Sequence, residues 1–259
     1  MKNKFPKHLE KDMEKLYSRA IVTIGKKFLP QIKKAFNEST NITDFTIKLN
    51  KIIDEDFVKY IGAATLPGID KEIELVSAWA FSQTKKAVVN LQGLTAEQIR
   101  EGILVNKKNP VYLTFVKKTI EKNKDLVKAL GKEYIDGVSQ NAIKTFIDGG
   151  SRKDLTNKML EYTDENLNKA KFWARDQVGD AFAEFTAQQQ SLSGIKNYIW
   201  RTMGDNAVRD DHAELEGRVF SWSDGAMSTG LLSKPGASHP AEDYSCRCYA
   251  EPTNEDVTG

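Results

Sequence analysis

The chain has 259 residues, of which 40% are hydrophobic and 29% are charged, with 17 glycines and 7 prolines. This length accommodates one large domain or two smaller ones with a substantial core, and the composition excludes a disordered, collagen-like or low-complexity protein. The N-terminal sequence lacks the apolar segment of a signal peptide, and no run approaches the ~18 apolar residues of a membrane span. We therefore expect neither feature.

Charge is distributed unevenly along the chain, although the formal net charge is only +2. Residues 203–259 contain 11 acidic and 4 basic side chains, a net charge of −7, which leaves +9 for residues 1–202. A chain polarised in this way can place its basic part near an anionic partner. Helix surfaces that are simply solvated explain the same pattern, so both interpretations stay open.

The first 190 or so residues predict a series of helices, because apolar residues recur every three or four positions. The first series starts at Leu9 and is expected to be limited by Pro30. A second series runs from residue 45 to about 62, and the pair at 67–68, Pro-Gly, marks the start of a third. These patterns predict amphipathic helices that pack on one another.

Further helices are predicted in the next hundred residues. Thr95 and Gln98 have the spacing of a capping box that opens a short helix, and a long heptad-like pattern covers residues 113–134. The glycine pair at 149–150 breaks this pattern, and a helix is expected to restart behind it at Ser151. Thr163 is expected to open another helix, with one apolar face that extends to residue 185.

The composition changes after residue 194 and predicts a compact α+β module over about 195–253. Residues 196–202 and 218–222 have the aromatic and β-branched content of strands, with Tyr198 and Trp200 on one face of the first strand. Residues 208–215 predict two helical turns. The remainder is rich in Gly, Ser and Pro, and we expect no further regular elements there.

The predicted fold class is a mainly α N-terminal region followed by a small α+β C-terminal module. The expected division is a helical region at 1–148, a helical lead-in at 149–194, and the compact module at 195–259.

A string of spaced residues in this module is its most distinctive feature, and it comprises Trp200, Asp205, Val208, Arg209, His212, Leu215 and Gly217. On a helix, Val208, His212 and Leu215 share one face, and Arg209 beside them can reach back to Asp205. Asp205 is expected to cap the N-terminus of this helix. We expect these residues to have structural roles.

His212, His239, Cys246 and Cys248 together supply two imidazoles and two thiols, the ligand set of a structural zinc site. A loop-rich module of this size would gain a cross-link from such a metal without oxidation. A disulfide between the two cysteines would close a very small, strained ring. Packing or hydrogen bonding of the same four side chains is the alternative.

A zinc-dependent hydrolase or nuclease is the competing hypothesis for the same cluster. Its metal would be held by the histidines and one or both cysteines, with Glu214 or Glu216 as the general base. The sequence contains no nucleophile elbow, zinc-protease helix, phosphate loop or dinucleotide fingerprint. We therefore assign no catalytic residues and expect a protein that is not an enzyme.

Residues 107–132 are rich in lysine, a residue type that neutralises phosphates without reading a base sequence. The candidate nucleic-acid contacts are Lys107, Lys108, Lys117, Lys118, Lys122, Lys124, Lys128 and Lys132. A solvated helix surface is the alternative. If the basic helices are the functional surface, their binding to nucleic acid weakens steeply as salt increases.

The string from Trp200 to Gly217 and the closing Cys246-Arg247-Cys248 resemble the phage head morphogenesis family that is named after the Mu F protein. The sequences GGSRKDLTNKMLEY (149–162) and ARDQVGDAF (174–182) resemble the helical lead-in of that family, so the resemblance covers about residues 149–252. The long Gly/Ser-rich stretch at 224–238 departs from the family pattern, which leaves open whether His239 approaches the two cysteines.

The resemblance implies a minor head protein that is located in the virion or prohead interior and in the host cytoplasm during assembly. The implied partners are the phage portal, capsid or scaffold protein, which the helical region at 1–148 is expected to contact, with phage DNA as a further candidate and no membrane. A DNA-packaging adaptor that acts through the basic helices is a third hypothesis. The resemblance implies no catalysis. Assembly inside a cell also keeps thiols reduced, which favours a metal over a disulfide.

Overall fold

The computed structural model describes residues 5–63, 68–92 and 109–258. The chain forms two compact units, each built from separate segments. The mixed unit comprises Met1–Asp12, Asp70–Glu121 and Ala174–Gly259, and the helical unit comprises Met13–Ile69 and Lys122–Trp173. Within the described ranges, the helices lack the combination of length and apolar character that a membrane crossing needs.

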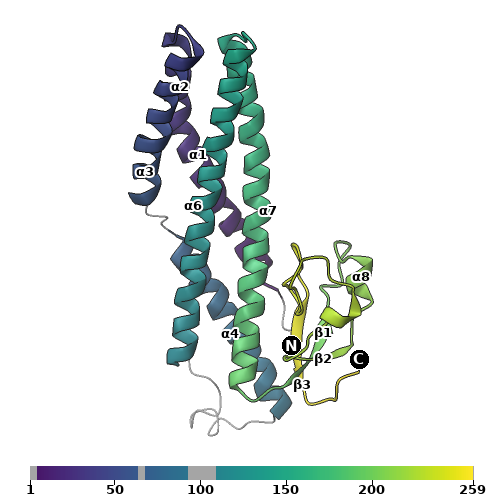
Figure 1. Ribbon diagram of the computed structural model, residues 1–259. Coiled ribbons are helices and arrows are strands. Elements are labelled where there is room, and N and C mark those ends of the chain that lie inside the picture. Colours follow the sequence, from purple (N-terminus) through teal and green to yellow (C-terminus); the bar gives the residue numbers. More distant parts are fainter. Residues whose placement is uncertain (1–4, 64–67, 93–108, 259) are drawn as a thin grey trace. The chain divides into compact units, whose positions relative to one another are not determined.

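Helices account for most of the described chain up to residue 192. They are α1 (Lys7–Glu38), α2 (Ile42–Asn50), the π-helix η1 (Lys51–Phe57), α3 (Val58–Ala63), α4 (Ile69–Gln92), α6 (Pro110–Ile147) and α7 (Arg152–Leu192). Figure 1 labels the α-helices among them. The expected helical N-terminal region is confirmed. The short helix expected at Thr95 and Gln98 falls outside the described residues.

The core of the helical unit is aromatic. Phe28 of α1 makes an edge contact with Phe57, and Phe45 stacks on Phe146 with the ring centroids 4.9 Å apart. A buried hydrogen bond of 2.8 Å runs from the Tyr17 hydroxyl to the side-chain oxygen of Asn123. The periodicity predicted this burial well. One exception is the start of the heptad-like pattern, where Leu113 is exposed although the later positions are buried.

Two helix boundaries predicted from the sequence are wrong. Pro30 lies inside α1, which continues to Glu38, because the fully buried Phe28 and Ile32 on either side hold the segment helical despite the missing N–H. Thr163 lies in the middle of α7, where its hydroxyl donates to the carbonyl of Met159 at 2.6 Å instead of capping a new helix.

The break at the glycine pair 149–150 is confirmed, and α7 begins directly behind it. The Ser151 amide donates to Asp154 Oδ2 at 2.8 Å, and the Asp154 amide donates to Ser151 Oγ at 3.2 Å. This reciprocal pair satisfies amides that the first helical turn leaves free.

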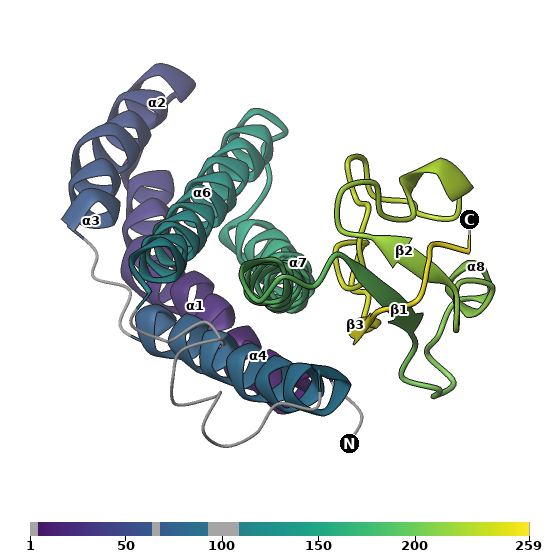
Figure 2. The same ribbon diagram turned by 90° about the horizontal axis from the view of Figure 1, so that it is seen from below.

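The mixed unit contains an antiparallel three-stranded sheet. Its strands are β1 (Asn197–Arg201), β2 (Val219–Ser221) and β3 (Tyr249–Thr253), and Figure 2 shows β1 between the other two. Tyr198 is paired with Phe220 on β2 and with Pro252 on β3. Tyr198 and Trp200 are both fully buried, which confirms the predicted face of the first strand.

The sequence did not predict β3, and the expectation of no regular element after residue 222 is wrong. The segment Tyr249–Thr253 contains Pro252 and a glutamate, a composition that disfavours a strand. In the described sheet β3 pairs with β1 alone, so Pro252 can take a place on an edge strand. A short 3₁₀ helix, η2 (Met227–Thr229), lies in the same supposedly irregular stretch.

The helix expected over residues 208–215 is shorter than predicted. Only Asp210–Ala213 forms a helix, α8, and turns follow it to Gly217. The backbone of Gly217 has a φ of +81°, a conformation that favours glycine, and its amide donates to the carbonyl of Trp200 at 2.9 Å. This turn brings the chain back into β2.

The loop between η2 and β3 is fastened to the C-terminal half of α7 within the mixed unit. The Lys234 ammonium binds Asp176 at 2.8 Å and Asp180 at 2.7 Å, and the Ser245 amide donates to Asp176 Oδ1 at 3.0 Å. At Gly179 the loop lies so close that an added Cβ would be 2.8 Å from the carbonyl oxygen of Ala241. The helix thereby fixes the loop that carries both cysteines.

Candidate metal centre

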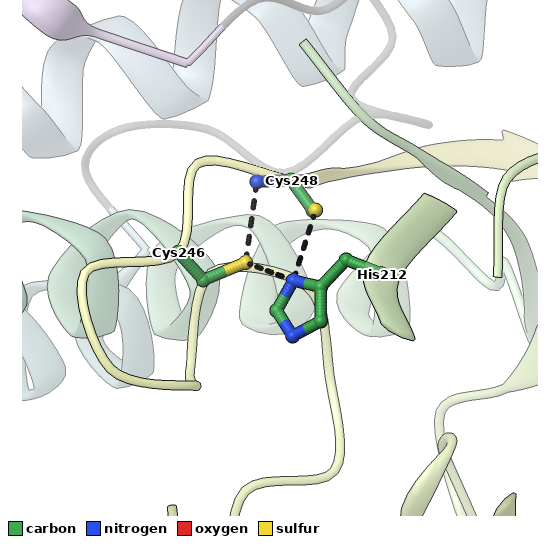
Figure 3. A group of neighbouring side chains, drawn as sticks. All are labelled: His212, Cys246 and Cys248. Carbon is green, nitrogen blue, oxygen red and sulfur yellow. Dashed lines mark hydrogen bonds between the residues drawn. The ribbon is translucent and has the colours of Figure 1, made fainter. Parts of the chain in front are cut away.

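Three buried side chains converge at the end of this loop. His212 lies in α8, whereas Cys246 and Cys248 lie just before β3, and all three are at most 5% exposed. Figure 3 shows both sulfur atoms beside Nδ1 of the His212 ring, at 3.4 Å for Cys246 and 3.6 Å for Cys248. The three ligand atoms lie within 4.8 Å of one another, as a shared metal ion requires.

The other ring nitrogen of His212 is held by a buried carboxylate. Nε2 lies 2.9 Å from Oδ2 of Asp243, which is fully buried, and Arg209 Nη2 also donates to this oxygen at 2.9 Å. The proton on Nε2 is therefore directed at Asp243, and Nδ1 faces the cysteines. Without a metal Nδ1 can donate a hydrogen bond to the Cys246 sulfur, and once it loses its proton it can offer its lone pair to a metal. Carboxylates orient metal-binding histidines in this way. Three backbone amides also donate to Asp243, those of Ser233 (3.1 Å), Lys234 (2.7 Å) and Tyr244 (2.8 Å).

The two thiols have different pKa values. Burial opposes ionisation of Cys246, but hydrogen bonds with Cys248 and His212 hold its pKa well below the usual value. The neighbouring Cys246 and burial raise the pKa of Cys248. Without a metal the site thus favours one thiolate and one thiol, and a metal that takes both sulfurs displaces a proton.

The cluster lies between a core and a pocket. Cys246 and Cys248 belong to a buried cluster with Trp200 and Phe220, and the indole of Trp200 contacts the His212 ring edge-on at 5.8 Å. On the opposite side the three ligand residues line a pocket of about 270 Å³. The arrangement can hold a metal ion that prefers sulfur and nitrogen ligands. Such an ion would be bound by residues that both pack on the core and line the pocket.

The structure does not bring His239 to this cluster. Its Nδ1 lies 3.0 Å from the hydroxyl of Tyr198, its amide donates to Glu242 at 2.9 Å, and its ring lies 4.9 Å from that of Trp222. Of the four ligand residues expected from the sequence, the structure therefore brings three together: His212, Cys246 and Cys248.

The comparison with protein families bears on the same part of the chain. Residues 136–251 match the model of a family that is described as Phage Mu protein F like protein. This region of the chain is Mu F-like. The match confirms the resemblance that the motif string indicates, begins at residue 136 instead of about 149, and includes all three residues of the cluster.

A curated relative extends the comparison without adding a function. A Haemophilus influenzae protein that is described as an uncharacterized protein is 30% identical over 130 residues, which are 50% of this chain and 27% of the relative. The chain thus spans about a quarter of that relative's length. No solved structure matches the chain.

The structure gives the positions of the motif residues, and two of their expected contacts are wrong. Trp200 and Leu215 are fully buried, and Val208 is half-buried in the lining of the pocket. Asp205 does not cap α8, because α8 begins five residues later. Its side chain instead accepts from the amide of residue 207 at 3.2 Å and pairs with Lys7.

The second correction concerns Arg209, which reaches forward instead of back. Its guanidinium donates to Asp243 and, at 3.1 Å, to the carbonyl of Tyr244. Asp243 is thus the important residue of the Mu F-like region that the sequence analysis missed. A carboxylate three residues before Cys246 was the available signal, but without the loop geometry it is one acidic residue among many.

The two candidate bases of the hydrolase hypothesis lie outside the pocket lining. Glu214 is exposed. Glu216 accepts from the amide and hydroxyl of Thr202 at 2.5 and 2.8 Å and pairs with Arg201. Partial burial would raise the pKa of Glu216, but these hydrogen bonds outweigh it and lower the pKa. A carboxylate held in this way is a poor proton acceptor.

The lysines of α6 lie mainly on its solvent side. Lys117, Lys118, Lys122 and Lys132 are exposed, whereas Lys124 and Lys128 are half-buried. Lys107 and Lys108 fall outside the described residues. Contact with nucleic acid stays a prediction.

Proposed function

We propose that this protein is a minor head protein of a tailed phage and acts in head assembly as a structural component, not as an enzyme. The observation that carries the proposal is the family match, which covers the sheet and the candidate metal centre together. The buried positions of Trp200 and Leu215, both in the shared motif, are those of residues that stabilise a fold. A stable module of this kind suits an assembly role.

A structural zinc ion held by His212, Cys246 and Cys248 stabilises the Mu F-like module. Thiolate and imidazole are the ligands that zinc prefers in structural sites, and two thiolates with a neutral imidazole balance its charge. The buried convergence of the three donors and the orienting role of Asp243 support this assignment. Thiols that stay reduced in the host cytoplasm remain available as ligands.

The helical unit contacts the portal, capsid or scaffold protein through a groove of about 630 Å³ that α1 and α7 line. Its apolar side chains include Val22 and Leu160, which are 36% and 56% exposed. Lys33, Lys34 and Arg152 also line the groove and make it basic. The matching segment on the partner is therefore acidic with interspersed apolar residues. We place the assembled protein in the virion or prohead interior.

The assembly role is tested by deleting the gene from its phage and restoring it in trans. We expect the deletion to reduce intact heads and infectivity, and the wild-type protein to restore both. The charge reversals Lys33→Glu and Arg152→Glu should lower the amount of protein in purified heads. Lys153→Glu is the matched control, since Lys153 is exposed on α7 but does not line the groove. Unaltered assembly and infectivity in the deletion phage, with purified procapsids that lack the polypeptide, would refute the proposal.

Phage DNA contacts the exposed lysines of α6. Replacing Lys117, Lys118 and Lys122 by glutamine should weaken binding of double-stranded DNA, measured by fluorescence anisotropy. Affinity of the wild type should fall steeply between about 50 and 200 mM salt, because bound lysines release counterions from DNA. Absent or salt-independent binding would remove both this contact and the DNA-packaging adaptor.

A zinc-dependent hydrolase or nuclease is the second candidate, and one observation favours it: the three-ligand cluster lines a pocket. Catalytic zinc sites keep one position open. Nuclease and esterase assays on the zinc-loaded protein separate the two functions. Metal binding without turnover supports the structural role, whereas hydrolysis that is lost on metal removal and restored by zinc would establish the enzyme.

A further inference from the structure

The candidate metal centre offers three ligands where zinc in structural sites takes four. Within the described parts of the chain, the group of converging His, Cys, Asp and Glu donors has three members, His212, Cys246 and Cys248. The fourth residue expected from the sequence, His239, is hydrogen-bonded to Tyr198. One coordination position is left for a ligand from outside this group.

The remaining position faces the pocket. All three ligand residues line this space of about 270 Å³, while the two cysteines also belong to the buried core cluster that contains Trp200, and the His212 ring contacts Trp200. A space of this size accommodates a small ligand or a few waters, since one water occupies about 30 Å³ in the liquid. The fourth ligand can therefore exchange without unfolding the module.

The lining of the pocket favours an anion. Arg209 and Arg247 both contribute to it. Each pairs with a buried carboxylate, Arg209 with Asp243 and Arg247 with Glu10, and their side chains stay 40% and 27% exposed. Asp205, also in the lining, pairs with Lys7. Zinc with two thiolates and one neutral imidazole carries no net charge, and the partly exposed guanidinium groups offer N–H donors to an anion that enters the pocket. Guanidinium groups match carboxylates in charge and in hydrogen-bond geometry.

The geometry points to a coordinatively open metal centre that takes a carboxylate as an exchangeable fourth ligand. This inference rests on the proposed zinc site and adds the class of its ligand. The carboxylate is that of a free small molecule or of an Asp or Glu side chain on a partner chain. Binding forms one bond between the metal and a carboxylate oxygen and breaks the bond between the metal and the water that it displaces. No other bond changes.

The test uses the full-length protein loaded with Co²⁺, whose visible absorption reports its ligands and geometry. Sulfur-to-cobalt charge-transfer absorption reports the bound metal, and the d–d bands report the fourth position. We expect one Co²⁺ per chain and saturable changes in the d–d bands when acetate or the blocked peptide acetyl-Gly-Glu-Gly-amide is added. A response to the peptide identifies a protein side chain as a competent source, and a response to acetate alone identifies a small molecule.

A pair of matched substitutions locates the ligand. Ala207 lines the pocket and is exposed, so Ala207→Trp narrows the pocket without disturbing a core. The acetate association constant should fall about tenfold or more, while Co²⁺ stoichiometry stays at one. Ala213→Trp is the control, since Ala213 is exposed on α8 but is not part of the lining. This variant should bind acetate like the wild type.

The outcomes separate the two proposals. If the chain takes up no Co²⁺, the proposed metal site fails and this inference fails with it. If Co²⁺ binds through sulfur but its d–d bands respond to neither probe, the centre is closed and only this inference is overturned. Equal acetate binding by the Ala207→Trp and Ala213→Trp variants would likewise overturn the assignment of the ligand to the pocket.

Discussion

The carboxylate of Asp243 joins the segment at 209–212 to the loop at 233–234. It is fully buried and accepts hydrogen bonds from the His212 ring, from Arg209 and from three backbone amides. Burial alone would raise its pKa, but the backbone hydrogen bonds and His212 lower it, so the carboxylate stays ionised. The ring of His212 is thereby fixed in the orientation that a metal ligand needs.

Replacing Asp243 by asparagine should weaken metal binding more than it changes packing. Asparagine keeps the volume, but its NH₂ group cannot accept the hydrogen bonds that Asp243 receives. We expect zinc affinity to fall about 10- to 100-fold and the free energy of unfolding to fall by about 1–3 kcal/mol. Competition with a chromophoric chelator and urea unfolding measure the two effects.

Asp224→Asn is the matched control for this substitution. Asp224 is exposed and accepts from the hydroxyls of Ser221 and Ser223, so its amide variant should retain wild-type zinc affinity. Equal zinc affinities of the Asp243 variant and the wild type would contradict the orienting role.

At the scale of single residues, the sequence predicted the residue types of the metal-binding cluster but not how they are arranged. Cys246, Cys248 and His212 stood out because thiols and imidazoles are rare in the chain. His239 stood out for the same reason, yet it packs beside Trp222 and away from the cluster. Asp243 could not be selected among 36 acidic residues, because its role depends on a loop without periodicity.

At the scale of elements, the loop between η2 and β3, which carries both cysteines, lies close to α7 because residue 179 of the helix is a glycine. Gly179→Ala would place Cβ 2.8 Å from the carbonyl oxygen of Ala241, a backbone atom that cannot turn aside. We expect a loss of about 1–3 kcal/mol in the free energy of unfolding. Helix propensity alone predicts a gain of about 1 kcal/mol for the same change, so the sign of the effect decides between packing and propensity.

Ser191→Ala provides the comparison for the glycine substitution. Ser191 is exposed near the C-terminal end of the same helix, and its replacement should leave thermal and urea unfolding nearly unchanged. A Gly179→Ala protein that is more stable than the wild type would show that the loop does not pack tightly on α7.

The ammonium group of Lys234 joins the loop to two carboxylates of α7, and this contact should depend on pH. Burial would lower the pKa of Lys234, but its hydrogen bonds to Asp176 and Asp180 raise it above 10.5. A raised pKa means that the contribution to stability is complete below the unfolded value and is lost as pH rises through the folded value. Lys234→Met should therefore be less stable than the wild type at pH 8, with a difference that shrinks above about pH 10.5.

Urea unfolding at pH 8 and at pH 11 measures this difference, with Lys196→Met as the control because Lys196 is exposed. Buried tyrosines such as Tyr198, whose pKa burial raises, affect both proteins equally and cancel in the comparison. A stability difference that does not change with pH would assign the effect of Lys234 to packing of its methylene chain.

Local sequence signals predicted the existence of the elements better than their ends. Pro30 and Thr163 are poor helix-interior residues in isolation, but packing overrides them inside helices of 32 and 41 residues. The reverse holds for Tyr249–Thr253, which has weak strand propensity and forms a strand because Trp200 and its neighbours on β1 provide a partner. In both cases the deciding contact comes from residues far away in the sequence.

At the scale of the whole chain, the division into two compact units determines what metal removal should do. The candidate metal centre lies wholly in the mixed unit, as do the ion pairs Lys7–Asp205 and Glu10–Arg247 beside it. The sequence predicted a helical part and a small α+β part, and the functional boundaries at residues 148 and 194 remain predictions. It could not predict that the long helices α1, α6 and α7 each contribute to both units, because periodicity does not report which distant segments pack together.

Removing the metal should loosen the mixed unit and leave the helical unit unchanged. Binding to the folded state alone stabilises that state, and local unfolding makes the effect regional. After chelation we expect faster amide exchange in α8, in the loop at 230–248 and in β3, because the metal would cross-link His212 of α8 to the two cysteines just before β3. Exchange in residues 13–38 and 122–147, which belong to the helical unit, should stay as it was. Hydrogen–deuterium exchange with mass spectrometry resolves these segments.

The double variant Cys246→Ser and Cys248→Ser separates loss of the metal from other effects of the chelator. Without the thiols this protein should show the faster exchange from the start and no further response to chelation. A uniform increase in exchange over both units would mean that they unfold as one cooperative body. An unchanged pattern in the wild type would mean that the folded module does not depend on a metal, because core packing around Trp200 already stabilises it.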